Sequence, residues 1–184
     1  MPPQHGSRGR GGKREPRRGD GPPDEFEQKV LDLSRVTRVT AGGKRMRFRA
    51  CVAIGDRKGR VGVGLAKGAD VSTAISKATT KARKLICEVP IVRDSIPFDI
   101  LMKFKAAKVL LKPAPKGTGI IAGGVVRLIL DLAGVPNVAA KMLGSTNRVT
   151  NAKATMEALN ALSVRGRGPQ RPSARTVPSP ASAS

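Results

Sequence analysis

A glycine-rich segment, PAPKGTGIIAGG at residues 113–124, follows the apolar run VLL at 109–111 and precedes an amphipathic segment. A strand, a glycine-rich loop and a helix in this order can cradle a phosphate, because backbone N–H groups and the helix dipole meet the anion there. The segment therefore suggests either a nucleotide site in an enzyme or a tight turn that a larger polyanion approaches closely.

A second glycine pattern, GRVGVGLAK at 59–67, is similar to a dinucleotide-binding fingerprint. The context does not fit such a site, because the segment belongs to a predicted antiparallel meander and no parallel strand with an acid for a ribose follows it. Gly62 and Gly64 recur at period two, so they share one strand face and let another element pack close to it.

The sequence shows no recognisable set of residues for catalysis or for metal binding. His5 is the only histidine and lies in a tail, which excludes His-based triads and His metal sites. Cys51 and Cys87 each lie in an apolar context and are interpreted as isolated buried thiols. The acids of the second half are scattered without a recognisable pair. We therefore expect no enzyme activity, no metal and no cofactor.

The charge of the chain points to a polyanionic partner. Its 184 residues hold 35 Lys plus Arg against 13 Asp plus Glu, a formal net charge of +22. Nucleic acid is the expected partner, because phosphate neutralisation dominates its affinity for proteins. No segment approaches 18 consecutive apolar residues, which argues against a membrane. With four Phe and neither Trp nor Tyr, structured RNA is favoured over single strands that need aromatic stacking.

Period-two alternation predicts three strands in the first half, at 33–41, 45–54 and 60–67, joined by the turns GG at 42–43 and DRKG at 56–59. Asp70 suits a helix N-cap, and an apolar stripe from Val71 to Ile86 predicts the helix that follows. DEFEQKVL at 24–31 is interpreted as a short leading helix.

Arginines crowd the first predicted hairpin. Arg45, Arg47 and Arg49 share one strand face about 7 Å apart, which roughly matches phosphate spacing along a nucleic-acid strand. No acid on that strand balances them, so we expect RNA contact there rather than a merely solvated face. The exposed lysines of the following helix are equally compatible with either role.

The second half predicts strands at 96–104, 106–112 and 138–143, a helix at about 121–133 and another at about 149–162. GSTN at 144–147 is expected to form a turn and helix cap, and also a polar recognition loop. The fold class is therefore α+β with two small domains, β-β-β-α followed by split β-α-β-α. The expected boundaries are a disordered basic tail at 1–23, domains at 24–90 and 91–163, and a disordered tail at 164–184.

Three motifs in order, GDxxGRVGxG, KPAxxGTGxIAGG and LGSTN, are highly specific together. On these motifs the chain resembles the bacterial ribosomal protein S5 family of the small subunit, over about residues 28–162. The resemblance implies a first domain related to double-stranded-RNA-binding modules. It also implies a second domain that shares its fold with galactokinase-like small-molecule kinases.

The same resemblance implies a structural role in the cytoplasmic small ribosomal subunit. Expected partners are small-subunit ribosomal RNA, ribosomal proteins S4 and S8, and messenger RNA near the channel by which it enters the subunit; no membrane and no small-molecule substrate are expected. Decoding accuracy and unwinding of incoming messenger RNA are implied functions. The loop at Ala41–Lys44 corresponds to the family's hairpin loop that influences spectinomycin sensitivity.

Several residues depart from the family pattern, and three of them add positive charge: Arg57, Lys116 and Arg148. KFKAAKV at 103–109 replaces a more glycine-rich stretch of the family's protein-contact region. The candidate protein-contact residues are Lys103, Lys105 and Lys108. The candidate RNA-binding residues are Arg35, Arg38, Gly42, Gly43, Lys44, Arg45, Arg47, Arg49, Arg57, Lys58, Arg60, Lys67, Lys116, Gly117, Thr118, Gly119, Ser145, Thr146, Asn147 and Arg148.

Two alternatives to the ribosomal role stay open on the sequence alone. One is a nucleotide-binding enzyme of the small-molecule kinase type, using the glycines at 117–124. The other is a free-standing protein that binds double-stranded RNA. The sequence favours the ribosomal interpretation, because no acid or base is placed to activate a hydroxyl group.

Overall fold

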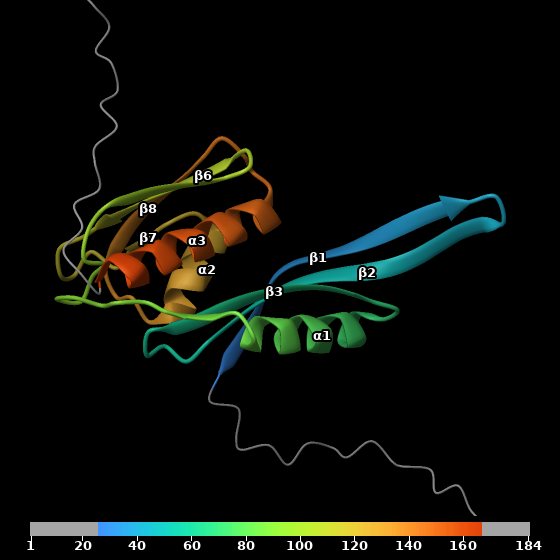
Figure 1. Cartoon of the computed structure of the whole chain (residues 1–184), viewed down its shortest axis with the longest axis horizontal. Helices are drawn as coiled ribbons and strands as arrows, with labels where there is room; N and C mark the ends of the chain where they lie inside the picture. The colour runs from blue at the N-terminus through green and yellow to red at the C-terminus, as the bar shows by residue number, and fades with distance from the viewer. Residues whose placement is uncertain (1–25, 167–184) are drawn as a thin grey trace, which may run out of the picture.

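The computed structural model of the protein describes residues 26–166, and its architecture is α+β, as predicted (Figure 1). The predicted disordered tails fall almost entirely outside the described residues. In chain order, the elements are β1 (Glu27–Thr40), β2 (Gly43–Gly55), β3 (Arg60–Gly68), α1 (Val71–Arg83), β4 (Ile86–Glu88), β5 (Ile100–Phe104), β6 (Ala107–Pro113), β7 (Ile120–Ile121), α2 (Gly124–Ala133), β8 (Val138–Leu143) and α3 (Arg148–Gly166).

These elements stack in four layers. Helix α1 covers one face of an antiparallel sheet with the order β1-β2-β3-β4, and α2 and α3 lie against the other face (Figure 1). The second sheet, with the order β5-β6-β8-β7, covers the far side of α2 and α3. One apolar core lies between α1 and the first sheet, and a larger one extends through both sheets and the two C-terminal helices.

Strand β1 corrects one prediction, because the expected helix at 24–31 is wrong. Residues Glu27–Thr40 form one long strand paired with β2, with an irregularity in the register between Val30 and Asp32. Pairing with β2 satisfies the backbone of this segment, and Leu31 is buried in the larger core. These contacts come from distant parts of the chain, and they override a short local pattern that is ambiguous between helix and strand.

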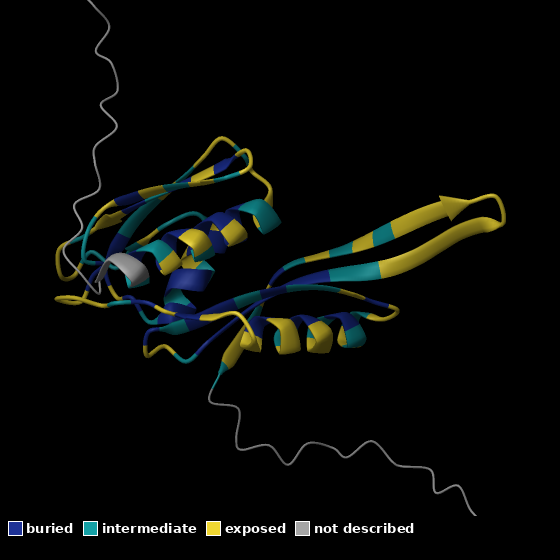
Figure 2. Ribbon diagram, viewed as in Figure 1, coloured by how far each residue is buried: buried dark blue, intermediate teal, exposed yellow. Residues whose placement is uncertain are grey.

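The hairpin of β1 and β2 extends well beyond the rest of the sheet. Strand β3 pairs with β2 only as far out as Phe48, so the outer part of the hairpin has two strands and no third. We call residues 33–49 the arm. Its outer part is exposed on both strands, and Figure 2 shows it projecting away from the buried layers. The arm therefore presents two faces to solvent.

Helix α1 packs unusually close to β3. A Cβ atom added at Gly64 would lie 2.0 Å from the carbonyl oxygen of Ala78, and one at Gly62 would lie 2.5 Å from that of Ala82. This confirms the prediction that these glycines allow another element to approach. The helix ends at Arg83, and Ile86 lies in β4 rather than on the predicted helical stripe, because β4 completes the sheet by pairing with β3.

The two halves of the chain join through backbone hydrogen bonds as well as through the shared core. The N–H groups of Arg57 and Gly59, in the turn between β2 and β3, donate to the carbonyl oxygens of Leu132 and Ala133 at 2.9 Å each. These carbonyls lie in the last turn of α2, where a helix has no partners of its own for them. The N-terminal half thus completes the end of a C-terminal helix.

Candidate nucleic-acid interface

The strand register brings basic residues together on one face of the arm. Arg38 lies directly opposite Arg45, and Arg47 and Arg49 follow at period two along β2. Lys67 on β3 lies opposite Arg49, so it extends the same face. A groove of about 300 Å³ is lined by Val36, Arg38, Arg45, Arg47 and Lys67 on this face, together with Thr37, whose side-chain position belongs to the other face. We call Arg38, Arg45, Arg47 and Lys67 the basic face.

The cations of the basic face have no acidic partners within residues 26–166. Arg49 differs, because it is half-buried and lies 3.7 Å from the carboxylate of Asp32 on β1. The same carboxylate lies 3.9 Å from Arg148, at the start of α3. Sequence reasoning missed this acid, since Asp32 is 17 positions from Arg49 in the chain and becomes its neighbour only through strand pairing.

The turn at the tip of the arm holds Gly42 and Gly43. Gly43 has a φ of +128°, which an L side chain rarely adopts, so glycine is required there. The hydroxyl of Thr40 donates to the Gly43 carbonyl oxygen at 3.1 Å and closes the turn. Arg35 and Lys44 lie on the face of the arm opposite to the basic face, because their positions have the other parity in the register.

Arg57, Lys58 and Arg60 lie at the opposite end of the first sheet from the arm tip. Asp56 organises this turn by accepting from the Lys58 N–H at 2.8 Å and from Arg60 Nε at 2.6 Å. Burial alone would raise the pKa of Asp56, but these hydrogen bonds outweigh it and lower the pKa. Arg57 reaches Glu27 at 2.8 Å. The guanidinium groups of Arg57 and Arg60 are thus engaged in contacts within the protein, whereas the contact of Lys58 is through its backbone N–H.

The glycine-rich loop differs from a phosphate cradle in where its N–H groups point. The amides of Gly117 and Gly119 both donate to Oδ1 of Asn137, each at 3.0 Å. Asn137 is buried, and its Nδ2 donates to the Asp94 carbonyl oxygen at 3.1 Å. Sequence reasoning missed Asn137; the available signal was a lone amide side chain at the start of an apolar strand.

Lys116 projects from this loop and is largely exposed, with its ammonium 2.8 Å from the carboxylate of Asp94. The hydrogen bond to Asp94 raises the pKa of Lys116, so the side chain is charged at neutral pH. Thr118 points inward to the turn, where its hydroxyl donates to the Pro115 carbonyl oxygen at 2.9 Å. Of the predicted loop residues, Lys116 is the one with a charged side chain, and its charge is paired with Asp94 within the protein.

The segment at 144–148 forms the turn and helix cap expected from its sequence. Oδ1 of Asn147 accepts from the Val149 N–H at 3.0 Å, and Oγ of Ser145 accepts from the Asn147 N–H at 3.2 Å. Thr146 and Arg148 are exposed beside them. Gly144 allows this turn to lie against the β5–β6 hairpin, since a Cβ there would meet the Ala106 carbonyl oxygen at 2.4 Å.

The predicted protein-contact lysines lie on that β5–β6 hairpin. Lys103 and Lys108 are directly paired across the two strands, and Lys105 lies in the turn between them with a φ of +53°. All three are exposed. The Phe104 ring lies 6.0 Å from the ammonium of Lys105 and 5.5 Å from that of Lys153 on α3. The lysines of the β5–β6 hairpin and Lys153 therefore form a basic group next to the 144–148 turn.

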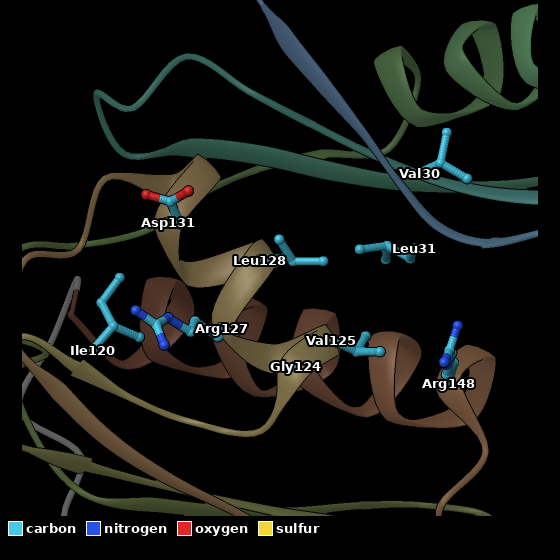
Figure 3. Close-up of a pocket in the computed structure, with 9 residues that line it drawn as sticks. All are labelled: Val30, Leu31, Ile120, Gly124, Val125, Arg127, Leu128, Asp131 and Arg148. Atoms are coloured by element: carbon cyan, nitrogen blue, oxygen red, sulfur yellow. The ribbon is translucent and has the colours of Figure 1, made fainter.

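A cavity of about 740 Å³ lies between β1 and the start of α2, with Leu128 and Leu31 directed toward each other across it (Figure 3). Arg127, Asp131 and Arg148 lie around it, and the carboxylate of Asp131 is bound by Lys29 at 2.6 Å. Asp131, one of the scattered acids of the second half, thus has a partner from the other half of the chain.

Nothing in the described residues brings three or more His, Cys, Asp or Glu side chains together as a metal site. Within the same residues, no helix is both long and apolar enough to cross a membrane. Cys51 and Cys87 are free and buried, as predicted. Burial raises the pKa of Cys51 to about 11, which keeps the thiol protonated and unreactive at neutral pH.

Comparisons with known proteins agree with the fold and with the motifs. The family model for ribosomal protein S5, N-terminal domain, matches residues 26–90, and that for ribosomal protein S5, C-terminal domain, matches residues 102–165. The small ribosomal subunit protein uS5 of Thermus thermophilus is 49% identical over 141 residues, which cover 77% of this chain and 87% of the relative.

Two further relatives agree with this assignment. The small ribosomal subunit protein uS5 of Thermotoga maritima is 46% identical over 139 residues, covering 76% of this chain and 78% of the relative. The small ribosomal subunit protein uS5c of Emiliania huxleyi is 46% identical over 139 residues, which cover 75% of this chain and 87% of the relative. Matches of this extent to both halves of the chain show that the protein belongs to the ribosomal protein S5 family.

Proposed function

We propose that this protein is a structural constituent of the small ribosomal subunit in the cytoplasm, and that it binds small-subunit ribosomal RNA through the basic face of the arm. Its relatives are small ribosomal subunit proteins by name. The observation that carries the RNA-binding proposal is the set of exposed cations at Arg38, Arg45, Arg47 and Lys67, with no acidic partner among the described residues.

The proposed mechanism is neutralisation of phosphates on a fixed scaffold, without turnover. Arg45 and Arg47 are two residues apart on one strand, which separates them by about 7 Å. Pairing with β1 holds their spacing before RNA arrives, so little backbone conformational freedom is lost on binding. Each phosphate contact releases condensed counterions, which makes the affinity strongly dependent on salt.

Other surfaces extend the proposal to the rest of the subunit. Lys116 and the 144–148 turn supply further contacts to ribosomal RNA, with Arg148 as the charged member of that turn. Lys103, Lys105 and Lys108 are proposed to dock on ribosomal proteins S4 and S8. Through these contacts the protein would support decoding accuracy and the entrance of messenger RNA into the subunit.

The test compares two doubly neutralised variants in binding to deproteinised small-subunit ribosomal RNA. R45Q/R47Q removes two cations of the basic face, and K112Q/K141Q removes two exposed cations from the second sheet. We expect R45Q/R47Q to weaken binding and to reduce the slope of log affinity against log salt by about 2. Equal affinities and slopes for R45Q/R47Q and the control would contradict the proposal.

A kinase-type function has no support in the geometry of the glycine-rich loop. Asn137 already accepts hydrogen bonds from the amides of Gly117 and Gly119, so these two are not available to a phosphate. Gly119→Val is expected to impair subunit assembly or accuracy without changing nucleotide affinity. A free-standing binder of double-stranded RNA would share the chemistry of the basic face. Sedimentation with small subunits separates these two, since only a ribosomal constituent sediments with them at stoichiometric levels.

A further inference from the structure

The arm has a second exposed face with a different chemical character. Val39 lies opposite Lys44, Thr37 opposite Met46, and Arg35 opposite Phe48, so these six side chains share the face away from the basic face. Val39 is 68% exposed and Met46 is 47% exposed. We call this surface, Arg35, Thr37, Val39, Lys44, Met46 and Phe48, the apolar face of the arm.

The apolar face continues the small core without a break. Nearer the body of the protein, the same sheet face carries Ala50, Val52 and Ile54, which α1 covers completely. Phe48 is packed against that core and is half-buried. Beyond Phe48 nothing within the described residues covers the sheet, so the apolar strip extends from a covered core to an uncovered tip.

Charge on this face decides which partner fits it. Arg35 and Lys44 are exposed beside Val39 and Met46, and neither has an acidic partner among the described residues. The whole arm, residues 33–49, holds six basic residues and no acidic one. A partner that covers Val39 and Met46 must therefore also supply negative charge on either side of them.

RNA supplies both features in one surface. An A-form helix has a wide, shallow minor groove that presents riboses and base edges between two rows of phosphates. A two-stranded ribbon fits the major groove of B-form DNA, and the wide, shallow minor groove of A-form RNA likewise leaves room for one to lie against it. Val39 and Met46 would pack on the riboses and base edges, while Arg35 and Lys44 reach the flanking phosphates.

We propose that the apolar face packs into an RNA minor groove, so that the arm is held between two segments of ribosomal RNA, one on each face. This proposal rests on the proposed RNA binding of the basic face. The two faces then contribute differently to affinity. Contacts of the basic face weaken with salt through counterion release, whereas apolar packing against riboses and bases does not.

The experiment separates the two contributions by measuring affinity for deproteinised small-subunit ribosomal RNA at several salt concentrations. V39T keeps a β-branched side chain and M46Q keeps a long unbranched one, so the double variant makes the apolar face polar at similar size and unchanged charge. We expect binding about tenfold weaker at every salt concentration, with the same slope as wild type. R45Q/R47Q is expected instead to lower the slope.

A matched control introduces two polar side chains on the second sheet, at apolar residues whose exposure is similar to that of Val39 and Met46. L101T/I121T changes side chains that are 59% and 58% exposed on the second sheet, and it is expected to bind as wild type. Circular dichroism and the thermal midpoint check that each variant is folded.

The other outcomes would overturn either the inference about the apolar face or the proposed RNA binding of the whole arm. If V39T/M46Q binds as wild type while R45Q/R47Q is weakened, the apolar face does not contact RNA and the inference is overturned. If V39T/M46Q binds free RNA normally but is lost from small subunits, the face contacts a protein, which also overturns it. If neither variant is weakened, the arm does not bind the RNA, and the proposed function itself fails.

Discussion

Replacing Asn137 with Ala tests whether the glycine-rich loop is organised from within. The side chain accepts two hydrogen bonds, from the amides of Gly117 and Gly119, and donates one to the Asp94 carbonyl oxygen. A hydrogen bond contributes about 1 kcal/mol net to stability. Gly117 is exposed, so water partly replaces the lost partner. Together these values give a loss of about 2–3 kcal/mol in the free energy of unfolding.

Thermal unfolding and amide hydrogen exchange measure this prediction in complementary ways. A loss of this size lowers the midpoint by roughly 6–10 °C in a protein of this length. Exchange of the Gly117 and Gly119 amides should rise more than at other loop positions. Asn137→Asp keeps the oxygen acceptor but loses the donor to Asp94, so it should preserve the protection of the two amides while still lowering the midpoint. Asn160→Ala, on an exposed part of α3, is the control and should change neither quantity.

If Asn137→Ala unfolds within about 2 °C of wild type and leaves both amides equally protected, Asn137 does not organise the loop. Such a result would mean that the amides have partners other than Asn137. Calorimetry with ATP and magnesium would then decide whether the loop binds a phosphate after all. For the wild-type protein we expect no measurable heat.

Three further predictions concern packing and protonation. Gly64→Ala should cost about 3 kcal/mol in urea unfolding, because its Cβ would collide with the Ala78 carbonyl of α1. Asp131→Asn should cost about 0.5 kcal/mol at pH 7, since the ion pair with Lys29 is partly exposed. Lys29 lowers the pKa of Asp131, so this difference disappears as pH falls through that pKa. Cys51 should resist thiol reagents at pH 8 until the protein unfolds.

Each of the three has a contrasting result. Gly42→Ala, with nothing within 4 Å of its added Cβ, should be tolerated, so an equal loss at both glycines would contradict the packing argument. An Asp131→Asn difference that is constant from pH 7 to pH 2 would exclude the ion pair as its cause. Rapid modification of Cys51 in the folded protein would show that its burial is incomplete.

The parts of the fold that could be predicted are those fixed by local patterns. Strand β8 begins and ends at the predicted residues, 138 and 143, because an apolar run lies between Pro136 and Gly144. Helix α2 ends at Ala133, the predicted last residue, and Gly134 after it adopts the left-handed conformation that favours glycine. Turn residues and helix-stopping residues act within a few positions, so sequence alone reveals them.

The parts that could not be predicted depend on distant neighbours. Residues 27–31 become strand because β2 pairs with them, and β4 forms because β3 has a free edge. In the candidate site, alternation placed Arg45, Arg47 and Arg49 on one face, and the register confirms that arrangement. The sequence pattern could not identify Asp32 as the neighbour of Arg49. Nor could it identify Asn137 as the residue whose side chain binds the amides of the glycine-rich loop. RNA contact by the candidate residues stays a prediction.

The hydrogen bonds between the β2–β3 turn and α2 have a consequence for the order in which the two halves of the chain fold. Because Arg57 and Gly59 complete the end of α2, the C-terminal half lacks two hydrogen bonds until the N-terminal sheet is in place. During synthesis the N-terminal sheet emerges first, and it can serve as the template on which α2 settles. A second contact joins the same two halves, because Asp32 at the base of the arm lies 3.9 Å from Arg148 at the start of α3.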